Sequence, residues 1–143
     1  MKTIIVGAGL AGLTCVKVLR WRGAEVAVFE ASDDIGGRVR TDVKDGFLLD
    51  RGFQESFTSY PVAGRHLDYE ALDFRGFDPG MVVRNGSEKS IHGQFAQTPG
   101  IHSRVPDNRT QTPGLALAGE YTEDSSINGS MLSGEKAAGT VIG

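Results

Sequence analysis

Three glycines near the start of the chain have the spacing of a phosphate-binding turn. Gly7, Gly9 and Gly12 form a G-x-G-x-x-G pattern, which Leu10 and Ala11 complete. In such a turn the first glycine permits a tight bend, the second lets backbone approach a pyrophosphate, and the third lets a helix pack on a strand. The N–H groups at the start of the following helix then attract the phosphates. The pattern predicts a dinucleotide site.

An acidic residue follows at the position where such a site holds a ribose. Glu30 ends a second apolar stretch, eighteen residues after Gly12. We expect its carboxylate to accept hydrogen bonds from both ribose hydroxyls. Ala31 follows instead of a basic residue, which disfavours a 2′-phosphate and therefore NADP. These residues do not separate NAD from FAD.

The elements that position these residues can be predicted from hydropathy. Residues 3–6 are apolar and β-branched, which is typical of a strand buried on both faces. Helical spacing begins at about Leu10, and Gly23 is expected to end that helix in a left-handed cap. Residues 25–30 predict a second strand. The first thirty residues therefore predict a right-handed βαβ unit with parallel strands.

The middle of the chain has weaker patterns. Residues 32–41 predict a loop with a short helical entry, and residues 46–53 predict a turn and a short strand. Residues 61–72 predict one modest helix with Val62, Leu67 and Leu72 pointing inward.

The last third begins with residues 85–114, which are polar, contain three prolines and predict a linker or long loop. Residues 114–119 are apolar and predict a short strand. Residues 126–142 predict a helix, one face of which carries only small side chains: Ser130, Ser133, Gly134 and Ala137.

Composition excludes several classes of partner. The chain has 143 residues and a net charge of −3 without blocks of like charge, which argues against nucleic acid and anionic membrane surfaces. No apolar run reaches the ~18 residues of a membrane span. Cys15 is the sole cysteine and we expect no leader before the first strand, so the prediction is a reducing, cytoplasmic location. We expect no metal site, and we expect the three histidines, His66, His92 and His102, to lie at the surface.

Residues 6–41 resemble the N-terminal segment of flavin-dependent amine oxidases, phytoene-desaturase-like enzymes and protoporphyrinogen oxidases. The resemblance implies FAD as the cofactor. It also implies that Gly36, Gly37 and Arg38 reach the FAD pyrophosphate. The chemistry agrees, because two glycines let N–H groups crowd an anion and an arginine can bind it with two hydrogen bonds.

Two further stretches resemble the same superfamily. Residues 115–139 resemble its C-terminal FAD segment, in which Glu120, after Gly119, would accept a hydrogen bond from the ribityl side of the cofactor. The next helix would direct its N-terminus at the N1–C2=O edge of the flavin, a contact that involves Ser126, Asn128, Gly129, Ser130 and Met131. The stretch LLDRGFQ resembles the segment beside the flavin ring and contributes Gly52 and Phe53.

These observations predict an α/β, Rossmann-like FAD-binding domain of the GR2 type with a parallel sheet and without a substrate domain. We expect one unit, 1–143, in which residues 85–114 join an N-terminal part (1–84) to a C-terminal part (115–143). The predicted function is a minimal or truncated FAD-binding module. An active FAD-dependent oxidoreductase with hydride transfer at flavin N5 is the alternative, and an NAD-binding module would explain the first glycine pattern only. No catalytic residue is assigned, and a homo-oligomer or a partner is expected to cover the exposed face of the flavin.

Overall fold

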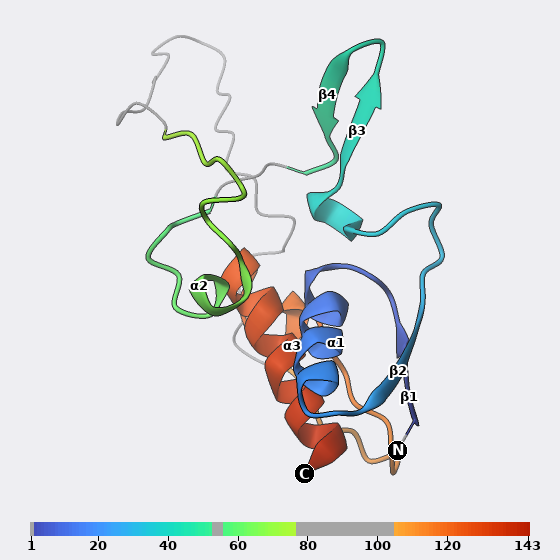
Figure 1. Ribbon diagram of the computed structural model, residues 1–143. Coiled ribbons are helices and arrows are strands. Elements are labelled where there is room, and N and C mark those ends of the chain that lie inside the picture. Colours follow the sequence, from blue (N-terminus) through green and yellow to red (C-terminus); the bar gives the residue numbers. More distant parts are fainter. Residues whose placement is uncertain (1, 53–55, 77–104) are drawn as a thin grey trace, which may run out of the picture.

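The computed structural model describes residues 2–52, 56–76 and 105–143 (Figure 1). The elements, in chain order, are β1 (Lys2–Val6), α1 (Leu10–Trp21), β2 (Glu25–Phe29), the 3-10 helix η1 (Gly37–Val39), β3 (Thr41–Lys44), β4 (Phe47–Asp50), α2 (Ala63–His66), the 3-10 helix η3 (Glu120–Thr122) and α3 (Ile127–Ile142).

The predicted βαβ unit is present, but β1 is not buried on both faces as expected, since Ile4 is 62% and Val6 85% exposed. β1 and β2 are parallel neighbours, with Lys2 opposite Glu25 and Val6 opposite Phe29, and α1 connects them. A methyl group at Gly12 would overlap the carbonyl oxygen of Gly7, so the helix packs on the strand as closely as the glycine spacing predicted. α/β architecture with parallel strands therefore follows directly from the first thirty residues.

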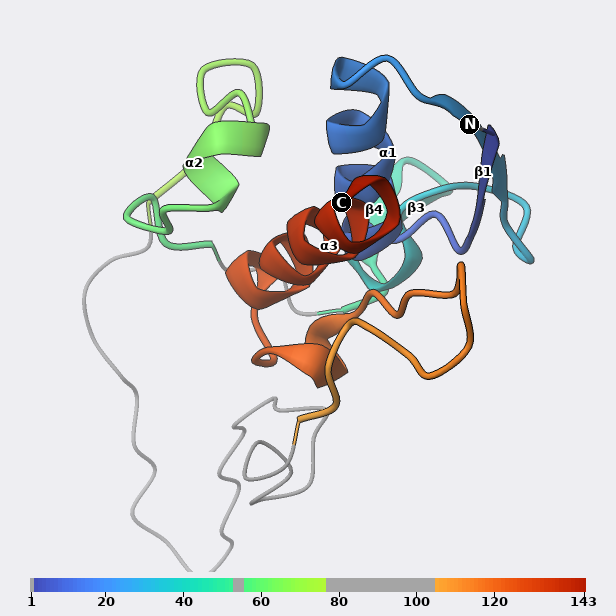
Figure 2. The ribbon, with the colours of Figure 1, turned by 90° about the horizontal axis from the view of Figure 1, so that it is seen from below.

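The C-terminal helix packs along α1, as Figures 1 and 2 both show. The small residues that the sequence placed on one face of α3 are all buried. The Ser133 hydroxyl bonds to groups outside α1, on Asn108, Gly119 and Thr122. A methyl group at Gly134 would overlap the carbonyl oxygen of Ala11 on α1. The main core cluster joins Cys15 and Leu19 of α1 to Ala137 and Ala138 of α3, so the two ends of the chain share one core.

The predicted helix over residues 61–72 is wrong in length. α2 covers only Ala63–His66, and Leu67 is extended with φ −99° and ψ 139°. The Asp68 carboxylate accepts the N–H groups of Glu70 and Ala71, and such local bonds compete with a helical backbone. Val62 and Ala63 are buried as expected for an inward face, whereas Leu72 is 47% exposed.

Within the described residues, the predicted strand over residues 114–119 forms no ladder, and its pairing there is one isolated bridge between Ala116 and Arg109. The Leu117 N–H donates to the carbonyl of Asn108, and the Asn108 amide donates back to the Leu117 carbonyl at 2.8 Å. The segment is therefore held by a neighbouring loop instead of a strand, and Asn108, which the sequence placed in a linker, is buried. Residues 85–104 of that predicted linker lie outside the described residues.

The sequence did not predict β3, which pairs antiparallel with β4 from Thr41 opposite Asp50 to Lys44 opposite Phe47. The hairpin extends away from the helix pair (Figure 1). Three of the four residues of β3 are polar, so the strand lacks the apolar pattern that sequence reasoning requires.

Candidate functional site

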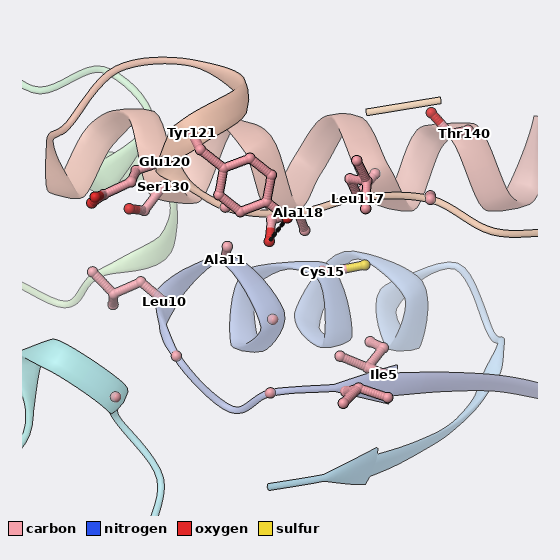
Figure 3. A pocket seen from close by; sticks show the side chains of 18 of the residues that line it. Ile5, Leu10, Ala11, Cys15, Leu117, Ala118, Glu120, Tyr121, Ser130 and Thr140 are labelled. Carbon is pink, nitrogen blue, oxygen red and sulfur yellow. Dashed lines mark hydrogen bonds between the residues drawn. The ribbon is translucent and has the colours of Figure 1, made fainter. Parts of the chain in front are cut away.

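A cavity of 1740 Å³ opens where β1, the start of α1, the segment 109–120 and α3 meet. It exceeds the roughly 300–1,000 Å³ of ordinary small-molecule sites, which suits a long ligand of two parts. Figure 3 shows Ile5, Ala11 and Cys15 on one side and Leu117, Ala118 and Tyr121 on the other. The predicted site residues that line it are Gly7, Gly9, Leu10, Ala11, Gly12, Gly36, Gly37, Arg38, Gly52, Gly119, Glu120, Ser126 and Ser130.

Two glycine-rich turns form one end of the cavity. The Gly36 N–H donates to the carbonyl of Ala8 at 2.8 Å, and Gly9 and Gly36 form a bridge. Gly36 and Gly37 have φ of 109° and 60°, conformations that favour glycine. A Cβ on Gly37 would lie 3.3 Å from the Cα of Gly9. The two turns can approach this closely because neither carries side chains at the contact.

The start of α1 remains open to a ligand. Gly9 is the N-cap residue, and no side chain in the described part of the chain caps the helix there. A Cβ built on Gly9 would meet no atom within 4 Å. The first N–H groups of a helix carry partial positive charge and need acceptors. The turn is therefore open at the position where the glycine spacing predicted a pyrophosphate.

Glu30 follows β2 but does not line the cavity itself. Its Oε2 accepts the Ala8 N–H at 2.6 Å, and its Oε1 accepts the N–H and the hydroxyl of Ser32 at 2.9 and 2.8 Å. These hydrogen bonds, the one from Ala8 first, lower the pKa of Glu30 to about 2. The carboxylate is thus ionised and fixed to the first glycine turn. Ala31 is exposed beside it.

Arg38 and Glu120 meet across the cavity. The Arg38 Nη1 lies 2.6 Å from the Glu120 Oε1, and the two residues are 82 positions apart in sequence. The Glu120 side chain is 15% exposed and that of Arg38 64%. Both residues were predicted to contact FAD, and the structure brings them together from opposite ends of the chain.

Of the residues at the start of α3 that were predicted near the flavin ring, some line the cavity and others do not. The Ser126 hydroxyl caps the helix by accepting the Gly129 N–H at 2.9 Å, and Ser130 lines the cavity. The Asn128 Oδ1 instead accepts the Val62 N–H, and Met131 packs on α2. The residues that line the cavity therefore do not include Asn128, Gly129 or Met131 among the described part of the chain. Phe53 lies outside the described residues.

Sequence reasoning missed several lining residues. These residues are apolar or weakly polar, and the sequence did not mark them as site residues because residues of the same types also fill a hydrophobic core. Cys15 is buried at the cavity wall, and burial raises the pKa of its thiol to about 11. The other missed residues include Ile5, Leu117, Ala118, Tyr121 and Thr140.

His66 is not a surface residue, contrary to expectation. Its side chain is 10% exposed, and its Nε2 lies 2.7 Å from Glu135 Oε1 on α3. Arg65 donates to the same carboxylate at 2.7 and 3.2 Å. Despite its partial burial, Glu135 has a lowered pKa because Arg65 and His66 donate to it. The cluster fastens α2 to α3, whereas His92 and His102 lie outside the described residues.

Two protein families match parts of this chain. Residues 5–70 match the family described as NAD(P)-binding Rossmann-like domain. Residues 70–142, about half of the chain, match the family described as flavin containing amine oxidoreductase. The chain belongs to this flavin-containing family. The match confirms the predicted resemblance, the Rossmann-like fold and FAD as the family's cofactor.

Individual relatives are similar over part of their length. The chain is 38% identical over 78 residues to coproporphyrinogen III oxidase of Propionibacterium freudenreichii subsp. freudenreichii, covering 54% of this chain and 15% of the relative. It is 36% identical over 90 residues to protoporphyrinogen oxidase 2 of Arabidopsis thaliana, covering 59% and 18%. A solved structure of putrescine oxidase with bound putrescine is 39% identical over 46% of this chain and 15% of that chain, with a TM-score of 0.41. The chain thus spans less than a fifth of these relatives. In the described residues, no helix combines the length and apolar character needed to cross a bilayer.

Proposed function

We propose that this chain is an FAD-binding module in which both ends of the chain hold one cofactor. The observation that carries the proposal is the cavity, at which the open helix start, the two glycine turns and the Arg38–Glu120 pair meet. The residues fit the group, because the uncapped N-terminus of α1 and the space at Gly9 suit a pyrophosphate.

The proposal assigns a part of FAD to each wall. Backbone N–H groups after Gly9 and the Arg38 guanidinium hold the pyrophosphate. Glu30 holds the adenosine ribose from the side of the first glycine turn, and Glu120 accepts a ribityl hydroxyl. The N-terminus of α3, with Ser130 beside it, faces the flavin edge, where its dipole stabilises negative charge. When bound, the flavin supplies hydride chemistry.

Cofactor release from the purified protein tests the proposal. Chromatography of the released material is expected to show FAD, and finding NAD or FMN instead would refute the assignment, because FMN lacks the adenosine half that Glu30 is proposed to hold. Titration of the apoprotein with FAD is a second test. Arg38→Ala should bind FAD at least tenfold more weakly than the wild type, since a charge-assisted bond contributes about 1.5–3 kcal/mol. Arg22→Ala, an exposed cation at the far end of α1, is the matched control.

A second candidate function, substrate oxidation, is favoured by the family match to amine oxidoreductases. Such a reaction needs the substrate about 3–3.5 Å from flavin N5 in a site that excludes water. Stopped-flow reduction by primary amines, polyamines and carotenoid precursors discriminates the two functions. Saturable reduction faster than that of free FAD supports the enzyme, and its absence supports the binding module.

The proposal also includes a cytoplasmic location and a partner or second copy over the open side of the flavin. The single cysteine, buried in its reduced form, supports a reducing compartment. Exposed apolar side chains beside the cavity support a covering partner, since Val6 is 85% and Leu115 52% exposed. Light scattering after size exclusion, with and without FAD, measures whether a second copy is that partner.

A further inference from the structure

The Glu30 carboxylate has most of its hydrogen-bonding capacity filled by the chain itself. Ala8 N–H donates to Oε2 at 2.6 Å, whereas Oε1 accepts the Ser32 N–H at 2.9 Å and the Ser32 hydroxyl at 2.8 Å. An ionised carboxylate offers about four acceptor positions. Two of the three donors reach Oε1, so Oε2 keeps a position for a hydroxyl of the ligand. The sequence expectation that Glu30 serves both ribose hydroxyls stays a prediction.

Ser32 supplies two of these three bonds. Its hydroxyl, which has one proton, also lies 2.7 Å from the carbonyl oxygen of Asp34. The side chain therefore sits between the carboxylate of Glu30 and the backbone of the loop after β2. The Ala8 bond fixes one oxygen of the carboxylate and Ser32 fixes the other, so together they set the plane in which Oε2 presents its remaining lone pair.

We propose that Ser32 is a positioning residue for the adenosine ribose: it orients Glu30 so that Oε2 accepts a hydrogen bond from the 2′-hydroxyl. This inference rests on the proposed binding of FAD. An acid at the end of the second strand of a dinucleotide-binding βαβ unit bonds that hydroxyl. Ser32 itself acts through Glu30.

Two ligands and four proteins test the inference. The ligands are FAD and an FAD analogue that lacks the 2′-hydroxyl of the adenosine ribose, and binding is followed by flavin fluorescence. The proteins are the wild type, Ser32→Ala, Ser32→Thr and the control Ser59→Ala, which alters an exposed serine away from the cavity. Melting temperatures without ligand show that each variant is folded. If Ser32→Ala does not fold, Ser32→Cys replaces it, because a thiol of similar size donates only weakly.

Ser32→Ala should weaken FAD binding about three- to tenfold, the loss typical of one hydrogen bond to a charged group that is partly retained. Ser32→Thr keeps the hydroxyl and should stay within about twofold of the wild type, as should Ser59→Ala. With the deoxy analogue, Ser32→Ala and the wild type should bind equally.

Equal FAD affinity of the wild type and Ser32→Ala would overturn the inference while leaving the proposed function intact. An equal loss with FAD and with the deoxy analogue would also overturn it, because the hydroxyl would then act only on the loop. If the wild type binds no FAD, the proposed function fails and the inference fails with it.

Discussion

The contact between α1 and α3 can be tested with one substitution at two positions of the same helix. A methyl group at Gly134 would overlap the Ala11 carbonyl oxygen and lie 2.9 Å from Thr14 Cβ and 3.1 Å from Cys15 N. At Gly139 it would meet no atom within 4 Å. Both changes to alanine gain about 1 kcal/mol of helix propensity. Only Gly134→Ala must also push backbone apart, at a cost of typically 1–3 kcal/mol and occasionally more.

We expect Gly139→Ala to be up to about 1 kcal/mol more stable than the wild type. Gly134→Ala should be about 1–2 kcal/mol less stable, because the clash at rigid backbone falls at the upper end of the overpacking range. For a domain of this size the gap of about 1–3 kcal/mol corresponds to roughly 2–12 °C in melting temperature. Thermal unfolding followed by circular dichroism measures it. If Gly134→Ala melts at or above the temperature of Gly139→Ala, the close packing of the two helices is wrong.

Three further predictions concern the cavity and the carboxylate of Glu30 near it. Gly9→Ala should leave the melting temperature without ligand within about 2 °C, because the methyl group points into open space, but should weaken FAD binding at least tenfold in a fluorescence titration. The folded chain lowers the pKa of Glu30 from 4.5 to about 2, so its ionised form contributes stability above pH 4.5 that is lost as the pH falls toward 2. The difference in unfolding free energy between the wild type and Glu30→Gln, measured in urea, should therefore narrow over that range. A constant difference would contradict the bonds to Ala8 and Ser32. Cys15 should react with a thiol reagent at pH 8 far more slowly in the folded chain than in denaturant, and equal rates would show that its burial is wrong.

The sequence predicted what depends on local spacing. The glycine turn, the helix that ends near Gly23 and the helix over residues 126–142 each use residues within a few positions of one another. The small-residue face of α3 was also predicted, because periodicity identifies a face even when its partner is unknown.

What could not be predicted depends on which groups find each other in space. Nothing in the type of Glu30 indicates that Ala8 and Ser32 would occupy its oxygens. The pairing of Arg38 with Glu120 depends on two turns from opposite ends of the chain. The length of α2 depends on Asp68, whose side chain offered the backbone another partner.

Arg38 and Glu120 are in contact although they are 82 positions apart in sequence, and this affects how such a site tolerates insertions during evolution. The entropy lost in closing a flexible loop grows only with the logarithm of its length, by about 0.6 kcal/mol for each doubling. A site assembled from the two ends of a chain is therefore nearly indifferent to how much sequence is inserted between them. The same pair of segments can therefore close over a short connection or over a whole inserted domain.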